Sequence, residues 1–268
     1  MQKVVRKVLR AVADYDPAYY DMHDDPNEAF FARIYVARIR AQLADAGIVP
    51  PATVLEAGCQ AGRLVLPFAQ MGFRVTGIDT SGFALRRAKR HVRAAGADAE
   101  LLQGDLVEVL QRRPERQYDV VICAEVLYLW PGYRAMLETL AGAVRPGGLL
   151  CVSHRPRFYY LLEALRHRDL ATARRVLSSS GGQFEGPFPE KGYYNWQDEP
   201  ALRALYGALG LRCRALYPID RYAWLAGVSP SQLDPAAQEA WLQLELEGQE
   251  PSAACGRYVL VIAEKPKA

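Results

Sequence analysis

Short apolar runs alternate with amphipathic stretches through the middle of the chain. The runs are continuous rather than alternating in polarity, which is typical of parallel strands that are covered on both faces. The predicted strands are residues 53–57, 73–78, 99–103, 118–123 and 149–153. Helical spacing of apolar residues predicts the helices between them, at residues 64–70, 81–95 and 133–144. Because strands that alternate with helices need crossover connections, the pattern predicts an α/β fold with a parallel sheet.

The residues before the first strand predict a helix that covers the sheet. We expect this helix to run from Glu28, with Asn27 as its cap, and to end near Gly47. Its apolar face is expected to hold Phe30, Ile34, Ala37 and Ala41.

After residue 154 the alternation pauses and then resumes. Residues 155–180 have helical spacing, and residues 181–195 form a predicted loop rich in glycine, proline and aromatic side chains. Further helices are predicted at residues 198–209 and 235–247, and further strands at 211–217 and 257–263. We therefore expect a single domain over residues 1–268. Its parts are a helical N-terminal cover (1–50), a core (51–154, 196–218 and 257–265) and two insertions that form a lid (155–195 and 219–256).

Composition narrows the class of protein. The 268 residues are 50% hydrophobic and 24% charged, and the net charge of +3 is too small to indicate a nucleic-acid-binding surface by itself. The five cysteines include no CxxC pair and no pair at metal-ligand spacing, so the sequence predicts neither a disulfide framework nor a metal site. Since neither a secretory signal nor a membrane-spanning run is visible, we expect a cytoplasmic protein without a membrane partner.

The segment Val54–Leu64 combines a strand, a glycine-containing turn and a helix start. Such a turn lets the backbone approach a ligand, and the helix N-terminus offers free N–H groups to an anion. A dinucleotide fingerprint would need glycine where Gln60 and Arg63 stand, which argues against a nicotinamide cofactor. Asp79 ends the second strand, where a carboxylate can accept both hydroxyls of a ribose. Asp105 follows the third strand and can accept from the exocyclic amino group of an adenine.

Five short sequence segments occur in an order that is typical of a known family. They are Glu56–Gly62 (EAGCQAG), Gly77–Asp79 (GID), Gly104–Leu106 (GDL), Tyr118–Val126 (YDVVICAEV) and Arg145–Gly148 (RPGG). Their order and spacing over residues 51–154 resemble those of class I S-adenosylmethionine-dependent methyltransferases, in particular small-molecule members such as the quinone-biosynthesis methyltransferases. Residues 198–217 and 258–265 resemble the last two strands of that family. The resemblance implies a Rossmann-like, seven-stranded, mostly parallel sheet with helices on both faces, an antiparallel last strand and helical insertions.

The resemblance also implies S-adenosyl-L-methionine as the cofactor. The loop from Glu56 to Gly62 would hold the methionine moiety, Asp79 the ribose, and Asp105 with the Leu106 backbone the adenine. The implied cofactor contacts are Glu56, Gly58, Cys59, Gln60, Gly62, Asp79, Thr80, Asp105, Leu106 and Ala124. The alternative for Glu56 is that it only bonds nearby backbone, and the alternatives for Asp79 and Asp105 are helix caps.

One position departs from the family, which usually has glycine where Gln60 stands. A side chain there restricts the backbone and could crowd the ligand, or it could donate to the methionine carboxylate.

Two residues are candidates for catalysis. Glu125 follows the fourth strand, beside the transferred methyl in this fold, and the alternative is an acid on a surface loop. His154 ends the fifth strand, and its topology would make it face the cleft as a general base. A histidine that orients the substrate, or that is merely solvated, is the alternative.

Aromatic side chains cluster in the segments that cover the acceptor pocket in this family. The candidate acceptor-binding residues are Tyr20, Tyr159, Tyr193, Tyr194 and Trp196. The alternative is that these aromatics only pack the insertions together.

The resulting hypothesis is an enzyme that transfers a methyl group from S-adenosylmethionine to a small-molecule acceptor. Cys123-Ala-Glu-Val126 stands where amino methyltransferases of adenine or glutamine carry Asn/Asp-Pro-Pro-aromatic, and Cys123 has no adjacent proline as a cytosine-C5 nucleophile would. A nucleic-acid partner is therefore not expected. Two alternatives stay open: a cofactor-binding regulatory protein of the same fold without turnover, and a methyltransferase acting on protein or RNA. The sequence leaves the oligomeric state and the methylated atom open.

Overall fold

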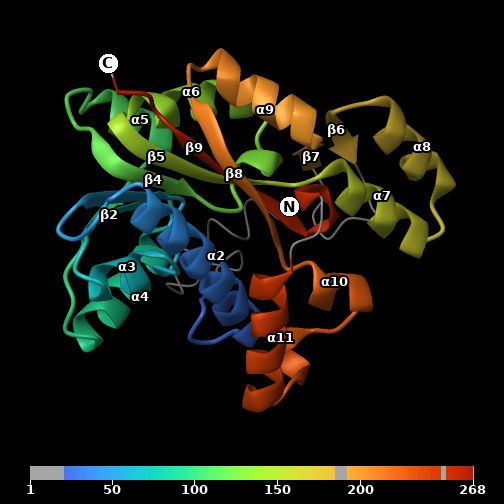
Figure 1. Ribbon diagram of the computed structural model, residues 1–268, viewed down its shortest axis with the longest axis horizontal. Helices are drawn as coiled ribbons and strands as arrows, with labels where there is room; N and C mark the ends of the chain where they lie inside the picture. The colour runs from blue at the N-terminus through green and yellow to red at the C-terminus, as the bar shows by residue number, and fades with distance from the viewer. Residues whose placement is uncertain (1–20, 185–191, 249–251, 268) are drawn as a thin grey trace.

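A seven-stranded sheet forms the centre of the molecule, with strand order β3-β2-β1-β4-β5-β9-β8 (Figure 1). The computed structural model describes residues 21–184, 192–248 and 252–267. The strands are β1 (Thr53–Ala57), β2 (Arg74–Asp79), β3 (Glu100–Gln103), β4 (Tyr118–Cys123), β5 (Val144–His154), β8 (Arg212–Ile219) and β9 (Tyr258–Glu264). Strands β1 to β5 pair in parallel, and β9 pairs antiparallel with both β5 and β8. The expected mostly parallel sheet with an antiparallel last strand is confirmed.

Helices cover both faces of the sheet because successive strand residues point to opposite sides. Val54 of β1 packs in one core cluster with side chains of α2, α3 and α4, whereas its neighbour Leu55 packs in the other with side chains of α5, α6 and α9. The helices of the first face are α2 (Pro26–Asp45), α3 (Val65–Gln70) and α4 (Gly82–Ala94). Those of the second face are α5 (Leu106–Gln111), α6 (Tyr133–Gly142) and α9 (Glu199–Ala208).

Helix α2 begins earlier than its sequence pattern suggested. Its cap is Asp25, whose side chain accepts from the Asn27 amide, because Pro26 suits the first helical position. Asn27 itself is bonded elsewhere, since its Oδ1 accepts from the Ser231 amide at 3.0 Å. The buried face is formed by Phe30, Phe31, Ile34, Tyr35, Ile39 and Leu43, and Ala41 of the expected face is exposed.

The region from residue 155 to 195 forms two helices and a hairpin at one end of the sheet (Figure 1). Its helices are α7 (Arg157–Arg166) and α8 (Leu170–Ser178), as the spacing predicted. The expected loop over 181–195 is instead framed by β6 (Gly181–Phe184) and β7 (Gly192–Asn195), which pair antiparallel. Glycine makes this pairing possible, because a Cβ on Gly181 would lie 2.8 Å from the Tyr194 carbonyl oxygen.

The region from residue 219 to 256 packs along α2 (Figure 1). Its elements are α10 (Tyr222–Ala226), the 3-10 turn η2 (Pro230–Gln232), α11 (Pro235–Glu247) and the 3-10 turn η3 (Ala253–Cys255). The Arg38 guanidinium of α2 donates to the Glu245 carbonyl of α11 at 2.7 Å. In the described part of the chain, no helix combines the length and apolarity that crossing a bilayer requires.

Candidate functional site

The loop after β1 turns sharply over the carboxyl edge of the sheet. Gly58, Gln60 and Gly62 all have positive φ, at +78°, +46° and +86°. The amides of Gly58 and Cys59 both donate to the Ile78 carbonyl at the end of β2, at 2.8 and 3.1 Å. Gln60 therefore adopts the left-handed conformation that favours glycine, at some cost in backbone strain.

Asp79 joins this loop to the end of β2. Its Oδ2 accepts from the Gln60 amide at 2.9 Å, and its Oδ1 accepts from the Ser81 amide at 2.8 Å. The side chain is only slightly exposed. The carboxylate is thus fixed at the sheet edge where the sequence predicted a ribose site.

Glu56 lies under the same loop and is buried. Its Oε2 accepts from the Val65 amide at 2.6 Å and its Oε1 from the Leu64 amide at 3.3 Å, so it satisfies the first N–H groups of α3. Burial raises the pKa of Glu56 to about 8, even though Arg63 and the two amides act against this. Glu56 therefore makes the hydrogen bonds to nearby backbone that were considered as its alternative role.

The other predicted cofactor contacts continue along this edge. Asp105 caps α5, with its Oδ1 accepting from the Val107 and Glu108 amides, so the cap considered as its alternative role is also present. The Gly104 amide donates to the Asp79 carbonyl at 3.0 Å, which holds the loops after β2 and β3 together. Of the remaining predicted contacts, Thr80 is exposed, whereas Cys59, Leu106 and Ala124 are buried.

Arg63 is a largely buried cation that sequence reasoning missed as a site residue. Its Nη1 lies 2.6 Å from Glu28 Oε2 of α2 and 3.0 Å from Glu125 Oε1 after β4. Burial raises the pKa of Glu28, and the Arg63 charge opposes that shift. Glu125 has φ +63° and donates its amide to Ser153 Oγ at 2.6 Å. The carboxylate of Glu125 is thus engaged by Arg63, which gives it a positioning role at the edge predicted for methyl transfer.

His154 does not face the cleft as the sequence analysis expected. Its side chain is fully buried on the α9 face, and its Nε2 lies 2.9 Å from the Tyr206 hydroxyl. Burial lowers the pKa of His154 to about 4, so the ring is neutral at pH 7 but has no access to a substrate proton. A general base at His154 finds no support in this geometry, because alternation along β5 turns its side chain away from Ser153 and Arg155.

The predicted acceptor-binding aromatics separate into different environments. Trp196 and Tyr194 pack against Tyr160, with ring centroids 5.0 and 5.5 Å away, and Trp196 is fully buried. Tyr159 lies on the other side of Tyr160, with its centroid 5.2 Å away. Tyr20 lies outside the described residues. Trp196 and Tyr194 therefore pack the insertion together, which was the alternative to acceptor binding.

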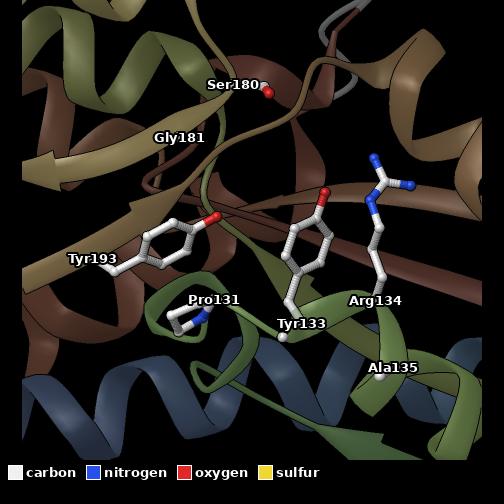
Figure 2. A pocket seen from close by; sticks show the side chains of 8 residues that line it. Pro131, Tyr133, Arg134, Ala135, Ser180, Gly181 and Tyr193 are labelled. Atoms are coloured by element: carbon white, nitrogen blue, oxygen red, sulfur yellow. The ribbon is translucent and has the colours of Figure 1, made fainter.

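Tyr193 lines a hollow of about 510 Å³ between the start of α6 and the hairpin. Figure 2 shows the rings of Tyr193 and Tyr133 on either side of it, with Arg134 beyond Tyr133. The hollow is formed by side chains from three segments, Pro131–Ala135, Ser180–Gly181 and Tyr193.

A second hollow, of about 430 Å³, lies between α2, α10 and η2. Glu28 is one of its lining residues. Because Glu28 pairs with Arg63, the hollow lies near the loop after β1. Its walls include the aromatic rings of Phe31 and Trp224 and the charged groups of Arg166, Asp220 and Arg257.

Asp220 is another charged lining residue that the sequence analysis did not select. It follows β8 with φ +52°, is buried, and has Oδ2 3.4 Å from Arg257 Nη1. Burial raises the pKa of Asp220 to about 6, with Arg257 opposing the shift. In the structure Asp220 stands out by its positive φ, which is unusual for a residue other than glycine. The sequence alone does not reveal this conformation.

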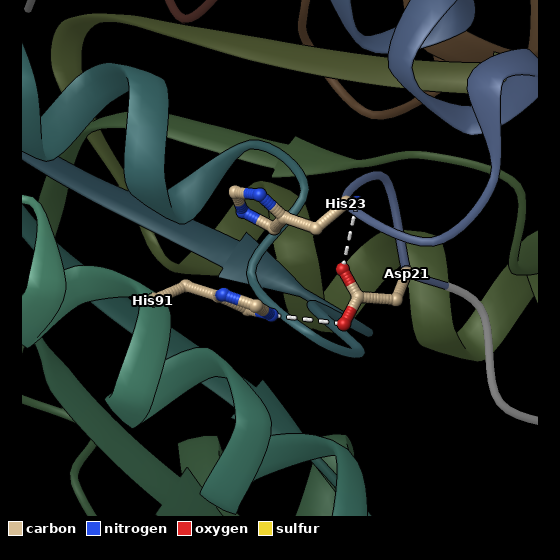
Figure 3. A group of neighbouring side chains, drawn as sticks. All are labelled: Asp21, His23 and His91. Carbon is tan, nitrogen blue, oxygen red and sulfur yellow. Dashed lines mark hydrogen bonds and ion pairs between the residues drawn. The ribbon is translucent and has the colours of Figure 1, made fainter.

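Asp21, His23 and His91 form a compact cluster beside α4 (Figure 3). Asp21 Oδ2 lies 2.9 Å from both His91 Nε2 and Arg87 Nη2, and the two imidazole rings stack at 3.8 Å. Because the Arg87 guanidinium already balances the Asp21 charge, we interpret the cluster as an ion-pair contact between the start of the described chain and α4.

The loop conformation predicts that two substitutions change the free energy of unfolding by different amounts. A Cβ on Gly58 would lie 2.5 Å from Val126 Cγ2, so Gly58→Ala adds a clash to the strain of a positive φ. We expect it to lower the free energy of unfolding by about 2 kcal/mol or more. Gln60→Gly removes strain and should change that free energy by less than about 1 kcal/mol. Urea denaturation measures both, and equal losses in the two variants would contradict the assigned loop geometry.

The buried Glu56 carboxyl predicts a pH dependence of stability. With a folded pKa of about 8 and an ordinary value of 4.5, the folded state keeps its proton between these pH values while the unfolded state has lost it. Stability contributed by this group therefore falls as pH rises through that window, by about 1.4 kcal/mol per unit.

Glu56→Gln should flatten the pH profile of the unfolding free energy between pH 5 and 8 because glutamine does not titrate. The exposed Glu108, which pairs with Arg112, offers the matched control Glu108→Gln, which should leave the profile unchanged. Parallel profiles for wild type and Glu56→Gln would refute the assignment.

Comparison with known proteins agrees with this architecture. Residues 54–148 match the family model described as a methyltransferase domain. A ubiquinone biosynthesis O-methyltransferase of Serratia proteamaculans (strain 568) is 34% identical over 116 residues, which cover 43% of this chain and 48% of that protein. The chain thus spans about half the length of the curated relatives it matches.

Solved structures share the fold over most of the chain. Magnesium protoporphyrin IX methyltransferase from Synechocystis PCC 6803, with bound S-adenosylhomocysteine, superposes with a TM-score of 0.57 at 18% identity, covering 98% of each chain. A methyltransferase from Thiobacillus denitrificans in complex with S-adenosylhomocysteine gives a TM-score of 0.53 at 19% identity, covering 84% of this chain and 90% of that one. Residues 54–148 of this chain therefore match the methyltransferase domain in sequence, and the chain shares the fold of solved S-adenosylmethionine-dependent methyltransferases.

Proposed function

We propose that this chain transfers a methyl group from S-adenosylmethionine to a small-molecule acceptor. The observation that carries the proposal is the left-handed loop from Gly58 to Gly62, bonded through the Gln60 amide to Asp79. Ligands of open α/β sheets bind at this edge, outside the carboxyl ends of the strands. The match of residues 54–148 to a methyltransferase domain supports the same activity.

The residues at this edge fit the parts of the cofactor. Asp79 and Asp105 are acceptors for the ribose hydroxyls and the adenine amino group, respectively. Gln60 Oε1 is buried with no hydrogen-bond partner among the described residues, and the ammonium of a methionine moiety is a donor that would satisfy it. Gln60 thus contributes an unsatisfied polar group where the family usually has none.

The chain's own contribution to catalysis is positioning. When bound, the cofactor supplies an electrophilic methyl group on a sulfonium, which is displaced in line by the acceptor. Arg63, held between Glu28 and Glu125, fixes α2 and the loops after β1 and β4 in one arrangement. Such fixed geometry lowers the entropic barrier of a two-substrate reaction.

The acceptor would occupy the hollow of about 430 Å³ beside Glu28. Its volume lies in the usual range of small-molecule pockets, and the rings of Phe31 and Trp224 suit an apolar or aromatic molecule. The relatives named as ubiquinone biosynthesis O-methyltransferases support a small-molecule acceptor. The two insertions would form the lid, since α7 and α10 supply Arg166 and Trp224 to the walls.

The cofactor assignment is tested by titrating S-adenosylhomocysteine, the product form, into the protein in a calorimeter. Wild type should bind it and should not bind NAD, because Gln60 and Arg63 occupy the glycine positions of a dinucleotide loop. Asp79→Asn should lower the affinity for S-adenosylhomocysteine at least tenfold, since it removes a charged acceptor worth about 1.5–3 kcal/mol per bond.

The exposed Asp98 between α4 and β3 provides a matched control, and Asp98→Asn should bind like wild type. Thermal unfolding of each variant separates loss of binding from loss of fold. Equal binding of NAD and S-adenosylhomocysteine by wild type, or unchanged affinity in a folded Asp79→Asn variant, would contradict the proposal.

A further inference from the structure

A buried guanidinium lies in a cage of tyrosine rings at the end of β5. Arg155 directly follows β5 and is 7% exposed. Its Cζ lies 3.8, 4.2 and 4.8 Å from the ring centroids of Tyr159, Tyr258 and Tyr128. These rings come from α7, from β9 and from the 3-10 turn η1 (Leu127–Leu129) after β4. The cage is therefore assembled by the tertiary fold and is not a local contact of neighbouring residues.

The Arg155 guanidinium has no carboxylate counterion among the described residues. Its Nη2 donates to the Tyr258 hydroxyl at 2.9 Å, whereas Nε and Nη1 are buried with no acceptor in the described part of the chain. No carboxylate oxygen of the described residues lies within 4.0 Å of an Arg155 nitrogen. In contrast, the neighbouring cations Arg63 and Arg257 are both paired with carboxylates. Tyrosine faces attract a cation but cannot accept its in-plane N–H groups, so the one N–H of Nε and the two of Nη1 have no acceptor among the described residues.

The cage lies on the face of the sheet where the cofactor loop lies. The adjacent Ser153 accepts from the Glu125 amide, and Glu125 pairs with Arg63 of that loop. On its other side, the cage adjoins the hollow of about 430 Å³, because Tyr159 packs on the lining residue Trp224 with ring centroids 5.4 Å apart. Arg155 thus lies behind the wall of the proposed acceptor pocket, from which the rings of Tyr159 and Trp224 separate it.

We propose that Arg155 binds an anionic group of the acceptor, and that the acceptor is an aromatic carboxylate. The inference rests on the proposed function, since it specifies the acceptor of that same site. One unpaired guanidinium calls for one negative charge, which favours a carboxylate over a phosphate dianion. The tyrosine cage and the Trp224 ring favour a planar aromatic body attached to that carboxylate.

Binding of benzoate in the presence of saturating S-adenosylhomocysteine tests this assignment, with benzamide as the uncharged isostere. Wild type should bind benzoate at least tenfold more tightly than benzamide, because only benzoate supplies the missing charge. Arg155→Met should lower the benzoate affinity to that of benzamide and leave the S-adenosylhomocysteine affinity unchanged. Arg155→Lys should retain part of the preference for benzoate, since it keeps the charge.

Arg134 provides the matched control, because it is exposed, lies over the Tyr133 ring at 5.4 Å and lines the other hollow. Arg134→Met should bind benzoate like wild type. Equal affinities of wild type for benzoate and benzamide would overturn the inference without depending on the fold of any variant, and so would unchanged benzoate binding by Arg155→Met. Failure of wild type to bind S-adenosylhomocysteine would instead contradict the proposed function itself.

Discussion

Charged side chains buried at the carboxyl edge of the sheet impose the constraint on which the site depends. A buried charge is costly unless it is paired or hydrogen-bonded, so each one dictates the position of its neighbours. Arg63 does this most extensively, since Glu28 of α2 and Glu125 after β4 both pair with it. Asp79 is satisfied by backbone amides and thereby holds the loop after β1 against the end of β2. Arg155 differs from them, because its Nε and Nη1 have no acceptor among the described residues, and these donors are the reason for the proposed ligand.

Much of the fold, and the position of the candidate cofactor residues at one edge of the sheet, could be predicted because they depend on local patterns. The strands 53–57 and 118–123 were predicted with the bounds that the structure has, since continuous apolar runs bounded by turns mark buried parallel strands. The placement of Asp79 and Asp105 at one edge followed from the topology of parallel strands alone. The left-handed turn at Gln60 could not be inferred from a residue that rarely adopts it.

The rest of the site depends on which face a side chain occupies at the end of a strand, and local patterns do not determine that. His154 and Arg155 are adjacent, yet the first packs on Tyr206 of α9 and the second enters the tyrosine cage on the opposite face. Sequence reasoning favoured the histidine because of its ordinary pKa, which burial then changes. Similarly, Trp196 looked like a pocket residue, but the β6–β7 hairpin next to it places it in the core.

A crystal structure of the protein with S-adenosylhomocysteine would show directly whether the charged side chains at this edge bind a nucleoside cofactor. We expect the ribose hydroxyls within hydrogen-bond distance of Asp79, the adenine beside Asp105, and the sulfur on the side of the loop that faces Glu125. Density for the ligand at another edge of the sheet, or with Asp79 out of contact with the ribose, would contradict it.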